Sequence, residues 1–154
     1  MEPTLGRVQI SGTSKIRAPA AFVAELLQDP EVLTAAIPGC TKLERGTRKA
    51  TFEITVEVGI GAIKGEQPAT LALARKSASS LTVTLRGTGA SRIEATAVVT
   101  LSISGTSTEI VYEGTISAHG AVARLGATAI EGAVSLLVRQ TLRNLKTEIE
   151  ARVG

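Results

Sequence analysis

Aromatic residues are nearly absent from this sequence. Of its 154 residues only Phe22, Phe52 and Tyr112 carry a large ring, and tryptophan does not occur. The core must therefore be built from Val, Ile, Leu and Ala, which favours a partly unfilled interior. The rings on which single-stranded nucleic acids stack are missing too, and a net charge of +3 does not by itself indicate a nucleic-acid partner. We therefore expect no nucleic-acid binding.

Cysteine and histidine occur once each, as Cys40 and His119. A single cysteine excludes an internal disulfide and a cysteine-based zinc cluster, and a single histidine excludes a multi-histidine metal site. Cys40 falls in a predicted turn, where we interpret it as a packing residue because no base lies nearby in sequence. His119 is interpreted as a polar boundary residue, since a general base needs partners that the sequence does not identify. We expect no metal and no covalently bound cofactor.

Long apolar runs are also missing. No stretch approaches the roughly 20 apolar residues that a membrane span needs, and residues 1–12 lack the apolar core of a secretory signal. These features predict a cytoplasmic protein. No repeat, low-complexity tract or linker interrupts the chain, so we expect residues 1–154 to form a single domain.

The first third of the chain is typical of one strand followed by two short helices. Apolar and polar residues alternate over 7–17, as in a half-buried strand. A first helix is expected over 20–28. Asp29 and the proline after it supply an N-cap and a first helical residue for a second helix. That helix should end just before Pro38, which disfavours helical geometry in the residue preceding it.

The middle of the chain predicts a meander of strands. Apolar and polar residues alternate, which indicates an antiparallel sheet with one wet face. The segments 87–89 and 104–107 are predicted hairpin turns. The expected strands comprise 51–58, 71–73, 81–85, 93–103 and 110–118.

After Gly120 the apolar period becomes helical and predicts a C-terminal helix of about 30 residues. Gly126 and Gly132 predict a bend in its first turns. An amphipathic helix must bury its stripe against the sheet, and a twisted sheet bends round it. The sequence thus predicts an α+β fold with a curved antiparallel sheet around a long C-terminal helix. The expected inward stripe consists of Ile130, Val134, Leu137, Val138, Thr141, Leu145 and Ile149.

Several inward positions carry small side chains that leave room for a ligand pocket between sheet and helix. Among them are Ala95, Ala97, Gly114, Ala118, Ala129 and Ala133. Tyr112 has two interpretations that stay open: a hydrogen bond to a ligand carbonyl, or a ring that fills the core and reaches a backbone partner. The predicted ligand-binding residues are Phe52, Ile54, Val56, Val99, Tyr112, Ile130, Ala133 and Leu137.

Three groups of residues carry a resemblance to a known family. The first combines Asp-Pro-Glu-Val-Leu at 29–33, Ile-Pro-Gly-Cys at 37–40 and Leu-Glu at 43–44. The second is Val-Gly-Ile-Gly at 58–61 with Lys-Gly at 64–65, and the third is Leu125-Gly126 with Ile130. Together they resemble the family of the G subunit of carbon monoxide dehydrogenase. That family belongs to the START-like, polyketide-cyclase-like superfamily of helix-grip folds. Relatives usually carry tryptophan at the position of Ala24, and a more regular strand where Pro68 stands here.

The resemblance implies a helix-grip fold and a non-catalytic role in ligand binding or recruitment. Relatives are associated with molybdenum-containing carbon monoxide dehydrogenases and are implicated in linking them to a membrane or a quinone. A quinone-like or lipid-like ligand and peripheral contact with the inner face of the membrane are therefore expectations.

Two alternatives stay open. One is a cyclase-like or hydrolase-like enzyme of the same superfamily, which would need paired acid and base groups in the cavity. The other is a protein–protein adaptor with a filled core.

Overall fold

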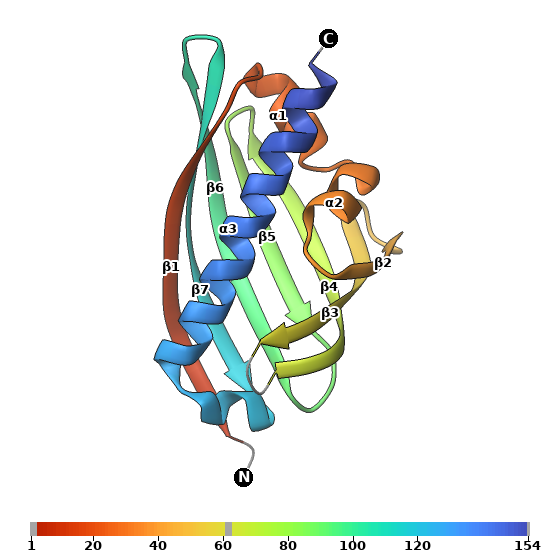
Figure 1. Cartoon of the computed structure of the whole chain (residues 1–154), viewed down its shortest axis with the longest axis vertical. Coiled ribbons are helices and arrows are strands. Elements are labelled where there is room, and N and C mark those ends of the chain that lie inside the picture. The colour runs from red at the N-terminus through yellow and green to blue at the C-terminus, as the bar shows by residue number, and fades with distance from the viewer. Residues whose placement is uncertain (1–2, 61–62, 154) are drawn as a thin grey trace.

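The described part of the chain folds into one curved antiparallel sheet and a long helix that crosses its concave face (Figure 1). The computed structural model describes residues 3–60 and 63–153. Within them the strand order across the sheet is β1-β7-β6-β5-β4-β3-β2. The strands are β1 (Thr4–Ile16), β2 (Cys40–Arg45), β3 (Thr51–Ile60), β4 (Ile63–Ser77), β5 (Ser80–Gly87), β6 (Arg92–Ser104) and β7 (Ser107–His119). The helices are α1 (Ala20–Leu26), α2 (Pro30–Ala36), the 3-10 helix η1 (Gly120–Leu125) and α3 (Ala127–Arg152). This is the predicted helix-grip architecture.

The two short helices follow the predicted local rules. The Asp29 carboxylate accepts hydrogen bonds from the backbone N–H groups of Glu31, at 2.8 Å, and Val32, at 3.4 Å, which makes it the N-cap of α2. At the other end of α2, Ile37 is extended, with φ −77° and ψ 115°, as expected for a residue before proline. The capping carboxylate and the two prolines that bracket α2 therefore fix its length.

The C-terminal helix is shorter than predicted. Residues 120–125 form the separate 3-10 helix η1, and α3 begins only at Ala127. Between them Gly126 has a φ of +87°, a conformation that residues with a side chain rarely adopt, so the chain changes direction there. Among the described residues no helix is both long and apolar enough to cross a membrane.

One strand of the sheet, β2, was not predicted from the sequence. Cys40 begins this edge strand rather than lying in a turn, and its Sγ is 3.4 Å from the Lys42 carbonyl oxygen. Burial raises the pKa of the Cys40 thiol. Alternation gives little signal in so short a strand, because Leu43 is its one large apolar residue.

Pro68 lies inside β4, which stays continuous around it. Its carbonyl oxygen accepts a hydrogen bond from the backbone N–H of Thr88 at 3.1 Å, so the backbone polar groups of Pro68 point towards β5. Ala69, the next residue, pairs with Gly87 at the end of β5. The missing N–H of the proline thus points past the end of the neighbouring strand, where no ladder bond is lost.

The apolar core is divided into two clusters along α3. One surrounds α1, α2 and the C-terminal part of α3, where Leu145 and Ile149 are buried. The other joins β1, β7 and η1 to the start of α3 through Ile130. Val99 and Leu142 pack against both clusters but are only partly buried. The interior between the clusters is therefore less densely filled than either end.

Polar contacts tie down the C-terminal half of α3. The Glu150 carboxylate accepts from Lys146 Nζ at 2.7 Å and from the backbone N–H of Arg17 at 2.8 Å. One turn and a half earlier, Asn144 Nδ2 donates to the Ala36 carbonyl at the end of α2, at 3.0 Å. These contacts attach the helix to the segment after β1 and to α2.

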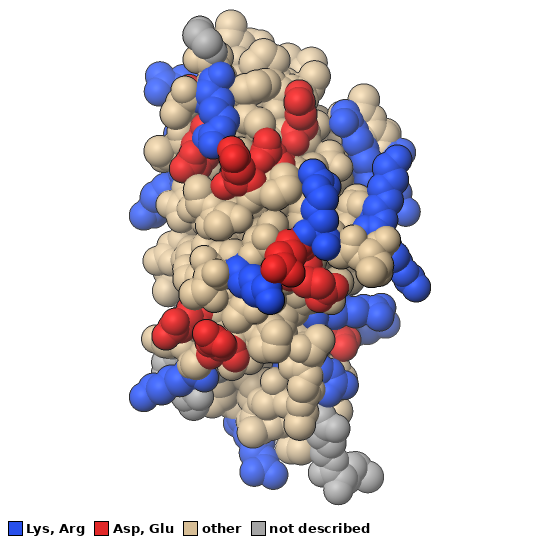
Figure 2. All heavy atoms as spheres, turned by 90° about the vertical axis from the view of Figure 1, so that its right-hand side faces the viewer, with Lys and Arg blue, Asp and Glu red and all other residues tan. Residues whose placement is uncertain are grey.

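Charges of both signs are mixed on the side of the molecule where α2 and β2 lie (Figure 2). Side chains of both signs meet in the middle of that face, whereas its right-hand edge in this view carries mainly Lys and Arg.

Candidate functional site

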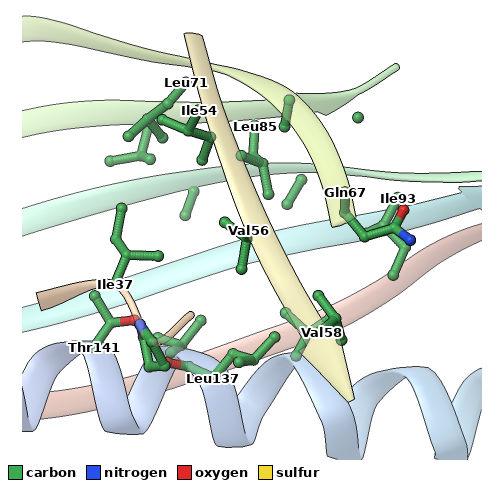
Figure 3. A pocket seen from close by; sticks show the side chains of 18 of the residues that line it. Ile37, Ile54, Val56, Val58, Gln67, Leu71, Leu85, Ile93, Leu137 and Thr141 are labelled. Carbon is green, nitrogen blue, oxygen red and sulfur yellow. The ribbon is translucent and has the colours of Figure 1, made fainter. Parts of the chain in front are cut away.

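A cavity of about 650 Å³ lies between the concave face of the sheet and α3 (Figure 3). Its described lining residues come from every strand except β2, from η1 and α3, and from the region of α1 and α2. Most lining residues are Val, Ile, Leu or Ala. Ile54, Val56, Leu71, Leu85 and Leu137 are among those seen in Figure 3. A space of this size and lining falls within the usual range of small-molecule sites.

Small side chains on the central strands account for part of this space. Ala95 and Ala97 on β6 point inward and line the cavity, yet they are only half-buried. Gly114 on β7 pairs directly with Ala97 but is not among the described lining residues, and a Cβ added to it would stand 2.8 Å from Ala97 Cβ, so this glycine lets β6 and β7 pack closely. In a filled sheet–helix interface these central positions would be the most buried ones.

The middle of α3 shows the same pattern. Its sheet-facing residues Val134, Leu137, Val138 and Thr141 line the cavity and are half-buried, as is Leu142. The buried residues of the helix lie towards its two ends, at Ile130, Ala133, Leu145 and Ile149. The predicted inward stripe is correct, but its central turns face empty space instead of the sheet.

The cavity reaches the surface at one end, which we call the mouth. The mouth is bounded by the β3–β4 hairpin, the β5–β6 connection and η1, where the exposed residues Lys64, Pro68, Ser91 and Ala121 line it. Arg92 also lines this end, with its Nε 3.6 Å from Glu94. The polar lining residues thus concentrate at the mouth, whereas the interior is apolar apart from Tyr112 and Thr141.

Six of the eight predicted ligand-binding residues line the cavity: Ile54, Val56, Val99, Tyr112, Ala133 and Leu137. Whether they contact a ligand stays a prediction. Phe52 and Ile130 are not among the described lining residues. Phe52 is 1% exposed in the first core cluster, with Arg45 Cζ 5.7 Å from its ring centroid, and Ile130 is 0% exposed in the second. Both point inward as expected but belong to the filled ends.

Among the described lining residues, Tyr112 is the one with an aromatic side chain. It pairs across the sheet with Gly12, and its ring lies over that glycine. A Cβ added at Gly12 would stand 2.5 Å from the tyrosine hydroxyl oxygen. Burial raises the pKa of the Tyr112 phenol, and the charge of Arg139 partly opposes this rise. The group is therefore a neutral phenol near pH 7.

Sequence reasoning missed several lining residues. Leu71, Leu73, Leu81, Val83 and Leu85 all line the cavity, and their alternation had already placed them inward. No sequence pattern predicted the residues of the mouth, because they come together only where three connections meet in the folded chain. Neither Cys40 nor His119 is among the described lining residues, and His119 Nε2 instead lies 4.0 Å from Glu94.

Solved structures share this fold. A conserved protein from Geobacillus kaustophilus superposes with a TM-score of 0.83 at 24% identity, covering 96% of both chains. A protein from Rhizobium leguminosarum gives a TM-score of 0.75 at 14% identity over 99% of both chains. The Zhui aromatase/cyclase from Streptomyces sp. R1128 gives 0.71 at 16% identity over 96% of both chains. At these identities the likeness establishes the helix-grip fold alone.

Sequence comparison assigns the family. No curated protein matches the chain. The profile of the family described as the G subunit of carbon monoxide dehydrogenase (CoxG) matches residues 12–150, which include nearly every element that builds the cavity. This protein therefore belongs to the CoxG family, that of the carbon monoxide dehydrogenase G subunit.

Proposed function

We propose that the protein binds one apolar small molecule, quinone-like or lipid-like, between its sheet and α3 without transforming it. The observation that carries this proposal is the cavity of about 650 Å³, whose described lining is mostly apolar and whose polar residues lie mainly at the mouth. Removing an apolar ligand from water would supply the affinity, at about 25 cal/mol per Å² of buried surface before the cost of association.

The composition of the lining favours binding over catalysis. A cyclase-like or hydrolase-like enzyme would need an acid and a base beside its substrate. Among the described lining residues none is Asp, Glu or His. The Thr141 hydroxyl is occupied, because it donates to the Leu137 carbonyl at 2.8 Å. The open interior also argues against an adaptor with a filled core.

Family membership suggests the partner. We propose that the bound molecule serves a molybdenum-containing carbon monoxide dehydrogenase-type enzyme, for which this protein is an accessory or recruitment factor. Surface plasmon resonance against such an enzyme from the same host tests this part separately. Saturable binding supports it, and no binding with or without an apolar ligand contradicts it.

The ligand proposal is tested by filling the cavity. Ala97 points into the cavity and Val98, the next residue on the same strand, is 47% exposed on the opposite face. Ala97→Phe should weaken binding of the neutral fluorescent probe N-phenyl-1-naphthylamine at least tenfold, because the new ring occupies the ligand's space. Val98→Phe adds a ring of the same kind outside and should leave binding unchanged.

Two outcomes of the titration contradict the proposal. One is a wild-type protein that does not bind the probe. The other is an Ala97→Phe variant that is folded by circular dichroism and binds the probe as the wild type does.

A further inference from the structure

Tyr112 is a largely buried polar residue that lines the cavity on the side of β1. The residue is 6% exposed, and no described residue forms a hydrogen bond with its hydroxyl. Among the described residues no side-chain polar atom is both fully enclosed and unpaired, so this oxygen keeps some accessible surface although it lies against Gly12. A hydroxyl removed from bulk water without a partner is costly, so such groups usually have a reason to persist.

The surroundings of Tyr112 hold its ring in place at one side of the cavity. Its ring lies over Gly12 on β1, and the next inward residue of β7 is Gly114. Ala97 lies beside Gly114 on β6 and lines the cavity, as does Ile10, the neighbour of Gly12 on the inward face of β1. The cavity therefore extends to the strand over which the hydroxyl lies.

The remaining polar groups of the interior are already engaged. Thr141 uses its proton for the Leu137 carbonyl, so its hydroxyl is an acceptor towards the cavity. Lys64, Gln67, Ser91 and Arg92 stand at the mouth. Tyr112 is thus the one interior lining residue whose side-chain proton is free for a ligand among the described residues.

We infer that the Tyr112 hydroxyl donates a hydrogen bond to an oxygen acceptor of the bound molecule, so that the cavity selects apolar ligands that carry such an oxygen over plain hydrocarbons. This inference rests on the proposed binding function and adds the chemical class of its ligand. Tyr112 acts as a positioning and specificity residue. A hydrocarbon ligand offers the hydroxyl no acceptor and therefore gains no affinity from it, whereas a ligand with an oxygen acceptor gains one hydrogen bond.

A matched pair of probes separates hydrogen bonding from apolar packing. Fluorenone and fluorene have nearly the same shape and differ by a carbonyl in place of a methylene. Equilibrium dialysis with each probe gives two dissociation constants per variant. In Tyr112→Phe the affinity for fluorenone should fall roughly three- to tenfold, the value of one hydrogen bond, while the affinity for fluorene stays within twofold.

A second variant serves as a control for the hydroxyl. Thr141→Val removes the other interior hydroxyl, whose proton does not face the ligand, and should leave the ratio of the two affinities unchanged. Tyr112→Phe should keep its thermal midpoint, since the hydroxyl has no described protein partner.

The outcomes distinguish this inference from the binding function. If Tyr112→Phe lowers both affinities alike, or changes neither, the hydroxyl does not select oxygen acceptors and the inference is wrong. If the wild-type protein binds neither fluorenone nor fluorene, the proposed binding function fails, and the inference fails with it. A selective loss for fluorenone supports both.

Discussion

Two glycines, Gly12 and Gly132, have opposite steric surroundings. At Gly12 an added Cβ would lie 2.5 Å from the Tyr112 hydroxyl oxygen and 2.7 Å from Cζ, whereas at Gly132 on α3 nothing lies within 4 Å. Gly12→Ala should lower the free energy of unfolding by about 1–3 kcal/mol, because the tyrosine ring must move. Gly132→Ala should raise it by about 0.5–1 kcal/mol, since alanine restricts the unfolded chain and favours helix.

Urea denaturation of the two single variants tests both expectations. An undiminished free energy of unfolding in Gly12→Ala would show that the ring of Tyr112 is not held against β1. A gain at Gly12 would show the same.

Glu150 predicts a specific response to acid. The hydrogen bond from Lys146, followed by that from the Arg17 backbone, lowers the pKa of Glu150 from 4.5 to about 2. A depressed pKa means that the stabilising contribution is complete above about pH 4.5 and is lost as the pH falls towards 2. Glu150→Gln should therefore flatten the fall in stability over this window.

Urea midpoints measured between pH 2 and pH 6 provide the test. A variant whose midpoint falls with pH as steeply as that of the wild type would show that the carboxylate does not hold α3 to the segment after β1.

At the scale of elements, the two ends and the middle of α3 should respond differently to truncation. Ile149 is 0% exposed in the first core cluster, whereas Leu137 already borders the cavity. Ile149→Ala should cost about 2–5 kcal/mol, because it opens a new void in packed surroundings. Leu137→Ala should cost less than half as much, since fewer of its atoms have packing partners to lose. Equal costs in chemical denaturation would mean that the middle of α3 is packed.

The expected contact with a membrane can be tested on the outer face of α3. Arg139 and Arg143 are exposed there, while Lys146 is engaged by Glu150. Each basic residue near an anionic surface contributes about 1 kcal/mol. If this face approaches a membrane, the double variant Arg139→Glu, Arg143→Glu should bind phosphatidylserine vesicles more weakly at low salt. The exposed Arg48, in the loop between β2 and β3, supplies the control Arg48→Glu, which should have little effect. Undiminished vesicle binding by the double variant would exclude this surface.

Periodicity predicted most elements because it reports which face of an element is apolar. Local signals, a capping carboxylate and two prolines, predicted α2. The spacing of apolar residues predicted the inward stripe of α3. It missed β2, where one leucine provides the whole signal, and it merged η1 with α3, because the chain reversal depends on the φ of Gly126.

The site was predictable in part for the same reason. Alternation places Phe52, Ile54 and Val56 on one inward face but does not say where along that face the helix leaves a gap. Phe52 lies at the filled end and Val56 at the gap, a difference set by α1 and α2, which are distant in sequence. The mouth could not be predicted, since it arises where three connections meet.

At the scale of the whole molecule, the cavity exists because the side chains between the sheet and α3 do not fill the space that these elements enclose. Seven strands curve round one helix, and two core clusters hold the ends of that helix. Between them the sheet presents the small side chains of Ala95 and Ala97, which line the cavity without filling it. An interior of this kind is suited to an apolar molecule that completes the packing.

The most direct test of this account is native mass spectrometry of the protein purified from its own host, compared with Ala97→Phe prepared in the same way. The account predicts that the wild-type protein carries one additional apolar species, extractable into organic solvent, and that the variant carries much less. Wild-type protein that shows only its own mass, and that also fails to bind N-phenyl-1-naphthylamine, would contradict it.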